Sequence, residues 1–245
     1  MKTLKKWYRN LTSSIKVTIL ICIIFYVLTI VFDFYYDLSL NYILGVYPVF
    51  SDNFKVYQIF TFLYTHSINP LHIIGNVLIL ILFGNPISKV IGDKNTYIFI
   101  FLTSIFSFIT FSSFKTYENN RFKNKMIELG IDVSKIKQDI NGSVKLEPFS
   151  HCTQKQLDYI YYYPYTNSSL SGLSGTCMGF IVCYFFLVKD RKKILNLLIL
   201  LFLFQEITFI MYNDLTISGT TFGHLGGLIG GLIFLSLYKI KKGIK

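Results

Sequence analysis

Two residues that hydrolytic enzymes use for chemistry stand at the starts of apolar stretches of this chain. Ser174 lies in a Gly-Leu-Ser-Gly run, and His224 follows a glycine later in the chain. A serine hydroxyl is a weak nucleophile until a base takes its proton, and histidine titrates in the right range to do so. His72 and Asn76 are four residues apart, so on a helix they share one face and can stabilise an oxyanion. These residues predict hydrolysis by a Ser–His pair.

The elements that must position these residues are membrane spans. Of 245 residues, 52% are hydrophobic and 15% are charged, and the apolar residues form long blocks. A continuous helix needs about 20 mainly apolar residues to cross the hydrocarbon core. Six segments meet or approach this length, at approximately 17–36, 70–87, 97–114, 173–188, 194–211 and 222–238. The fold class predicted is an all-α polytopic membrane protein with six transmembrane helices.

The basic residues predict the orientation of the spans. They gather at 2–16, 89–94, 189–193 and 239–245, which lie on one side of the membrane if the spans alternate. Because Lys and Arg favour the cytoplasmic side, both termini are expected to be cytoplasmic. The second, fourth and sixth spans then start at the outer face, where His72, Ser174 and His224 fall.

Paired glycines provide a means of bringing two of these spans together. Gly175 and Gly179 are four residues apart in the fourth span, and Gly227 and Gly231 are four apart in the sixth. Surfaces with small residues at this spacing let membrane helices approach closely. If the two faces meet, Ser174 and His224 come to a similar depth.

Each feature also has a simpler structural explanation. A serine at a helix start is usually a cap, an asparagine in a span can join helices, and glycine pairs often serve packing alone. A histidine in a span is by default a functional hypothesis. The joint placement on three spans of the same direction favours catalysis.

The chain begins with a basic N-terminus (1–16) and ends with a basic tail (239–245). The first three spans (17–114) include an aromatic outer loop (38–69). A polar extracytoplasmic insert (115–171) separates them from the last three spans (172–238). The net charge of +11 follows the span ends, so a nucleic-acid partner is not expected. The four cysteines form neither a disulfide framework nor a zinc pattern. No metal and no cofactor are expected, and the expected partners are the lipid bilayer and transmembrane protein substrates.

Three motifs together resemble the rhomboid intramembrane serine proteases: His72-x-x-x-Asn76, the Gly-Leu-Ser-Gly run at Ser174, and Gly-His224 followed by Gly227 and Gly231. His66 and the segment 83–84 also fit the pattern of that family. The resemblance implies a dyad of nucleophile Ser174 and general base His224. It implies that His72, Asn76 and the Ser174 backbone N–H form the oxyanion hole, and that substrates are cleaved near the outer surface.

The chain departs from the family at four places. The usual Trp-Arg pair of the first outer loop is Tyr57-Gln58, the usual acid after the second span is Ser88, and an aromatic residue after the nucleophile is Met178. The polar insert before Ser174 is also unusual. We expect it to recruit or screen substrates.

Two alternatives remain. A catalytically inactive rhomboid-like protein would bind membrane clients, although such proteins usually lack the serine or the histidine. A small transporter is suggested by Asp33 and Glu206, because acids in spans often mark ion paths. The simple six-span layout and the basic ends favour a bacterial plasma membrane for this multi-pass protein.

Overall fold

The computed structural model describes residues 8–36, 40–132, 168–188 and 219–243, together with positions 152–154, 156, 157 and 160. Every regular element in this part of the chain is helical. Strand-like pairing among these residues is one antiparallel bridge, between Val46 and Leu170. The all-helical expectation is confirmed for the described residues.

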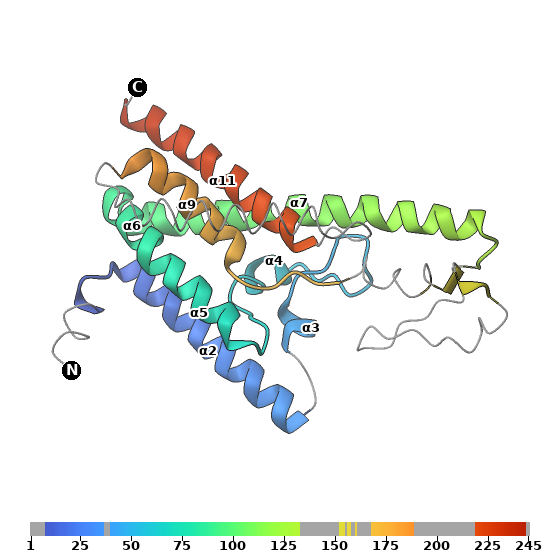
Figure 1. Cartoon of the computed structure of the whole chain (residues 1–245). Coiled ribbons are helices and arrows are strands. Elements are labelled where there is room, and N and C mark those ends of the chain that lie inside the picture. The colour runs from blue at the N-terminus through green and yellow to red at the C-terminus, as the bar shows by residue number, and fades with distance from the viewer. Residues whose placement is uncertain are drawn as a thin grey trace.

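Four helices in the described part are long and apolar enough to cross a membrane: α2 (Ser13–Tyr36), the unit Pro70–Ile91, α7 (Asp93–Glu128) and α11 (Gly219–Lys242). A shorter apolar helix, α9 (Ser174–Leu187), lies beside α11 and crosses α7 (Figure 1). The expected span 194–211 lies outside the described residues. The chain is therefore a multi-pass helical membrane protein.

The second span is continuous but contains a wide turn. α5 (Pro70–Ile79) passes through the π-helical segment η1 (Leu80–Gly84) into α6 (Asn85–Ile91). Pro86 lacks the N–H that an α-helix uses at this position, and its ring crowds the preceding turn. The wide turn accommodates the ring, with the Asn85 N–H donating to the Leu80 carbonyl. The helix thus crosses in one piece and ends before Gly92, whose φ is +82°.

The third span is much longer than expected. α7 has 36 residues, or about 54 Å, against a hydrocarbon core of about 30 Å. The predicted span 97–114 is part of this one helix, which continues through polar residues to Glu128. The first residues of the predicted polar insert therefore continue a membrane helix.

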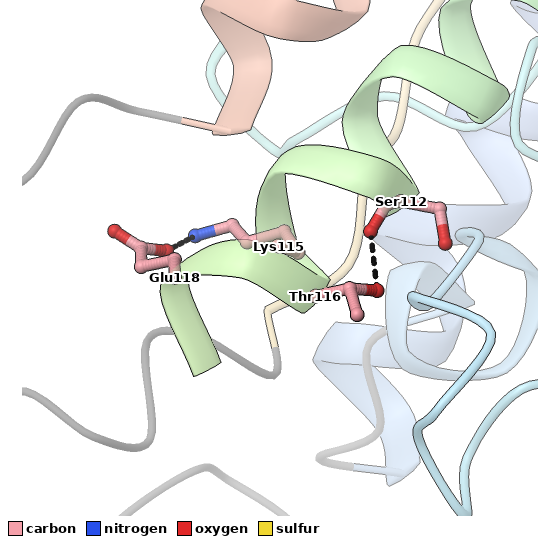
Figure 2. A network of polar contacts seen from close by, with 4 residues as sticks. All are labelled: Ser112, Lys115, Thr116 and Glu118. Atoms are coloured by element: carbon pink, nitrogen blue, oxygen red, sulfur yellow. Dashed lines mark hydrogen bonds and ion pairs between the residues drawn. The ribbon is translucent and has the colours of Figure 1, made fainter. Parts of the chain in front are cut away.

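A buried ion pair marks the part of α7 that lies beyond the predicted span. The ammonium of Lys115 lies 2.8 Å from the Glu118 carboxylate, and the two side chains are only 5% and 9% exposed (Figure 2). One turn away, the Thr116 hydroxyl donates to the Ser112 carbonyl at 2.8 Å (Figure 2). The start of α11 packs here, because a methyl group built on Gly219 would lie 2.5 Å from Cε of Lys115. Pairing offsets part of the cost of burying these charges, which either charge alone would bear in full.

The loop between α2 and α5 is folded onto α7. It contains α3 (Leu40–Leu44) and α4 (Gln58–Thr61). Phe54 stacks on Phe108 of α7 with a centroid distance of 5.8 Å. The Val49 N–H donates to the hydroxyl of Ser112 at 3.0 Å. These contacts fix the loop against the bundle, beside the start of α5.

Where α2 begins, a group of hydroxyls and one carboxylate joins it to α6 and α7. We call this group the Ser88 cluster: Thr12, Ser14, Ser88, Asp93 and Thr96. The Ser14 hydroxyl donates to Asp93 at 2.6 Å, so it accepts from Ser88 at 2.9 Å. The Ser88 oxygen accepts from Thr12 at 2.8 Å and from Thr96 at 2.9 Å. Ser88 thus uses its one donor and both lone pairs.

Candidate active site

Helices α9 and α11 meet through glycines. A methyl group built on Gly227 would overlap the backbone of Gly175, and one on Gly231 would lie 2.8 Å from Cα of Gly179. A methyl group on Gly179 would lie 2.9 Å from the Gly227 carbonyl oxygen. Only hydrogen fits at these positions, so the two backbones come closer than larger side chains permit. All four glycines of the two predicted faces lie in this interface.

The same interface sets the positions of Ser174 and His224 relative to each other. A methyl group on Gly175 would lie 2.9 Å from the carbonyl oxygen of Gly223. Gly175 follows Ser174 and Gly223 precedes His224, so the two residues lie at the same level of adjacent helices. Both are partly exposed.

Ser174 is the first residue of a short helix. α9 has 14 residues, which is about 21 Å of helix and less than the hydrocarbon core requires. The first N–H groups of a helix have no acceptor within it, so the Ser174 N–H is available to a developing oxyanion. A short span also allows its first residue to lie below the membrane surface.

His72 and Asn76 lie together on α5, on the side that faces the segment before Ser174. A methyl group on Gly172 would lie 2.7 Å from Nε2 of His72 and 3.6 Å from Nδ2 of Asn76. Gly172 has a φ of +101°, which a residue with a side chain rarely adopts. Glycine at 172 therefore lets the backbone before Ser174 pass directly against two side-chain nitrogens.

The other ring nitrogen of His72 is held by a hydroxyl. Nδ1 lies 3.1 Å from Oγ of Ser67, in the loop before α5. When Ser67 donates to Nδ1, the proton of the neutral ring is on Nε2, which faces Gly172. His72 also interacts electrostatically with His224, so the imidazoles of α5 and α11 are near each other. We call this group the Ser174 site: His72, Asn76, Gly172, Ser174 and His224.

A scan against protein families matches the Rhomboid domain over residues 53–133 and 149–240, which is well over half of the chain. The chain belongs to the rhomboid family. No curated protein and no solved structure matched in the corresponding searches. Rhomboids are generally intramembrane serine proteases that act on membrane proteins, and some members are inactive. The two matched stretches leave only 134–148 between them, so the part that departs from the rhomboid domain is much shorter than the predicted insert of 115–171.

The rhomboid loop before α5 is anchored even though a glutamine stands where the family has arginine. Gln58 is 1% exposed. Its oxygen accepts from the Lys55 N–H at 2.9 Å, and its nitrogen donates to the carbonyls of Ile43 and Asn53 at 3.1 and 3.2 Å. A neutral amide with three backbone partners therefore holds the loop in this rhomboid.

A carboxylate lies near Ser88, the position at which the family resemblance led us to expect an acid. Ser88 is the centre of the Ser88 cluster, and Asp93 supplies the carboxylate five residues later. Met178, which stands in place of an aromatic residue, is 4% exposed in the core. Among the described residues no group of three or more His, Cys, Asp or Glu is arranged to hold a metal ion.

Two features of the site were not found from the sequence. The need for glycine at 172 arises from its φ and from the nearness of α5, and the contact of Ser67 with His72 depends on the path of the loop. His66 was noted only as part of a family pattern, yet its ring lies 3.0 Å from Asn76. Two histidines and three hydroxyl or amide residues within 66–76 were the available signal.

Proposed function

We propose that this protein is an intramembrane serine endopeptidase that cleaves transmembrane protein substrates near the outer membrane face. Ser174 is the nucleophile, His224 is the general base, and His72, Asn76 and the Ser174 N–H stabilise the oxyanion. The observation that carries the proposal is the glycine contact of α9 with α11, in which Gly175 lies against Gly223. It supports a Ser–His pair at one level, beside two side-chain nitrogens.

The chemistry follows from these roles. His224 takes the proton of the Ser174 hydroxyl as its oxygen attacks the scissile carbonyl carbon, and the carbonyl oxygen becomes an oxyanion. His224 then gives that proton to the leaving amine as the peptide bond breaks. A water molecule attacks the resulting ester, with His224 again as base, and Ser174 is released. Donors placed in a water-poor site stabilise the oxyanion strongly, and losing one typically costs about 100- to 1000-fold in rate.

The proposed topology has six spans, cytoplasmic termini and a bacterial plasma membrane as its setting. The starts of α5, α9 and α11 then lie toward the outer face. The length of α9, about 21 Å, supports a serine that lies within the membrane. Substrates therefore reach Ser174 from the lipid phase.

The decisive test uses the purified full chain in lipid vesicles with a generic transmembrane substrate. Ser174→Ala and His224→Ala are expected to reduce cleavage to background, whereas the matched control Ser171→Ala retains it. Cleavage by Ser174→Ala at the wild-type rate would refute the dyad. Labelling of Ser174 by a serine-directed fluorophosphonate separates an active enzyme from an inactive rhomboid without a known substrate.

We further propose that the residues between the two matched stretches, 134–148, screen substrates. Deleting them leaves α7 and its Lys115–Glu118 pair intact, since α7 ends at Glu128. The deletion is expected to change the relative rates for a panel of transmembrane substrates while each is still cleaved. An unchanged ranking of the panel would contradict this role.

A further inference from the structure

His66 is a buried histidine whose two nitrogens both have partners. It lies in the loop before α5 and is 0% exposed. Nδ1 lies 3.1 Å from the Tyr64 carbonyl oxygen, and Nε2 lies 3.0 Å from Nδ2 of Asn76. Its ring meets that of His72 edge-on, with a centroid distance of 5.1 Å. It therefore touches both side chains of the oxyanion hole but does not face Gly172 itself.

The hydrogen-bond partners fix which nitrogen carries the proton. A carbonyl oxygen can only accept, so Nδ1 of His66 donates to Tyr64. The ring is neutral near pH 7, because burial, helped by the charge of His72, lowers the pKa of His66 to about 4. A neutral imidazole that is protonated on Nδ1 has a lone pair on Nε2. Nε2 must therefore accept from Asn76.

This acceptor selects one orientation of the Asn76 amide. The two ends of an amide have nearly the same shape but opposite hydrogen-bonding roles. If the amide were turned over, its oxygen would face the lone pair of His66. The NH₂ end therefore points to His66 and uses one N–H there. Its nitrogen is also the atom that lies 3.6 Å from the methyl position on Gly172, so the second N–H is left for the site.

We propose that His66 is a positioning residue of the hydrolytic site, which accepts one N–H of Asn76 so that the other is directed at the oxyanion. The role rests on the proposed function of Ser174 and His224. It acts on the transition state rather than on substrate binding, so it affects kcat far more than KM.

Two substitutions separate the contact with Asn76 from the contact with Tyr64. In His66→Gln the terminal amide reaches the position of Nε2, and its oxygen can accept from Asn76. In His66→Asn the shorter amide reaches only the position of Nδ1, so it can donate to the Tyr64 carbonyl but cannot reach Asn76. His66→Asn is expected to lower kcat by about 100-fold, as loss of an oxyanion donor does, with KM little changed. His66→Gln is expected to recover most of that loss.

A double-mutant cycle tests whether His66 acts through Asn76. In an Asn76→Ala background, adding His66→Asn is expected to leave kcat unchanged. The control is Asn41→Ala, which removes the hydrogen bond from Asn41 to the His66 carbonyl at 3.0 Å and disturbs the same loop without touching the ring. It is expected to lower the thermal stability and to leave kcat near that of the wild type. Losses of kcat that multiply in the double mutant would overturn the proposal.

A measurement on the wild-type protein covers the case in which His66→Asn does not fold. Nitrogen NMR of ¹⁵N-histidine-labelled protein, with signals assigned by their absence in His66→Gln, reports the protonation of each ring nitrogen. The expected result at pH 7 is a neutral His66 protonated on Nδ1, and a ring protonated on Nε2 overturns the proposal. If Ser174→Ala still cleaves, the proposed function fails, whereas this NMR result concerns His66 alone.

Discussion

The Ser88 cluster and the Ser174 site are polar groups at opposite ends of the same span, since α5 begins beside one and α6 ends beside the other. In the Ser88 cluster, hydroxyls and a carboxylate bind one another, and Ser88 is 1% exposed. In the Ser174 site, Nε2 of His72 and Nδ2 of Asn76 face the Cα of Gly172, which carries only hydrogen atoms. Ser174 and His224 are partly exposed.

The difference shows how one helical bundle keeps the polar groups that stabilise the fold apart from the polar groups that we propose for catalysis. Groups that bind one another completely hold helices together, because an unpaired polar group in an apolar interior is costly. Groups that are oriented by the protein but face a space can bind a transition state. Substitutions in the Ser88 cluster should change the stability of the protein, and substitutions in the Ser174 site should change the rate of cleavage.

Outside the proposed Ser174–His224 dyad, the largest effect is expected at Gly172. In Gly172→Ala the new methyl group would lie 2.7 Å from Nε2 of His72, and φ at this residue is +101°. The methyl group would displace the side chain of His72, so kcat should fall by about 100- to 1000-fold. Steady-state cleavage in lipid vesicles measures this effect. Gly130→Ala is the matched control, because that residue also has a positive φ, +71°, but open space around it. A Gly172→Ala enzyme with wild-type kcat would show that the close approach of Gly172 to His72 is not needed for catalysis.

The second-largest effect is expected at the glycine interface between α9 and α11. In Gly227→Ala the methyl group would overlap the Gly175 backbone, so α9 and α11 must separate. Overpacking of this kind costs about 1 to 3 kcal/mol, and the separation also moves Ser174 from His224. Both the thermal midpoint in detergent and kcat should fall. Gly75→Ala has nothing within 4 Å of the new methyl group and should lower neither. Loss of stability with full activity in Gly227→Ala would separate packing from catalysis.

The pH dependence of stability provides a test of His66. The groups around it are the Tyr64 carbonyl, Asn76 and the His72 ring, with His224 interacting through His72. Burial lowers the pKa of His66 to about 4, from about 6.5 when the protein is unfolded. Only the unfolded state gains the proton between these values, so stability falls as the pH is lowered from 6.5 to 4, by at most about 3 kcal/mol. Thermal midpoints across this range should fall less steeply for His66→Gln. Equal slopes would contradict the burial of a neutral ring.

The sequence predicted the parts of this molecule that depend on local pattern. Long apolar blocks located four spans, and the second of these was predicted to begin at residue 70, which is the first residue of α5. It missed that the third span continues to Glu128, because the polar residues there were assigned to the insert, and an ion pair with tertiary packing makes their burial possible. Catalytic roles for Ser174 and His224 remain predictions.

The contacts between distant segments could not be predicted from pattern alone. The role of Gln58 in anchoring the loop depends on three backbone groups that the fold brings to it. The pairing of Asn76 with His66, and that of Ser88 with Thr12, also depend on the fold. Such contacts follow from the path of the backbone, which residue spacing does not determine.

The smallest effect on rate is expected in the Ser88 cluster, where stability should change instead. Ser88→Ala removes hydrogen bonds to Thr12, Ser14 and Thr96. All three hydroxyls keep another partner, since Ser14 still donates to Asp93, Thr96 to the Gly92 carbonyl, and Thr12 lies 3.4 Å from the Ser14 hydroxyl. The loss should therefore be about 1 to 3 kcal/mol rather than the sum of three bonds.

A second buried serine provides the control for that prediction. Ser88 and Ser104 are both 1% exposed, but Ser104 binds only the Phe101 carbonyl of its own helix at 2.7 Å. Ser104→Ala should thus lower the thermal midpoint less than Ser88→Ala, and both should keep the wild-type kcat at temperatures below unfolding. A selective loss of kcat in Ser88→Ala would mean that the far end of the span is coupled to the Ser174 site. The separation of structural from chemical polar groups would then not hold.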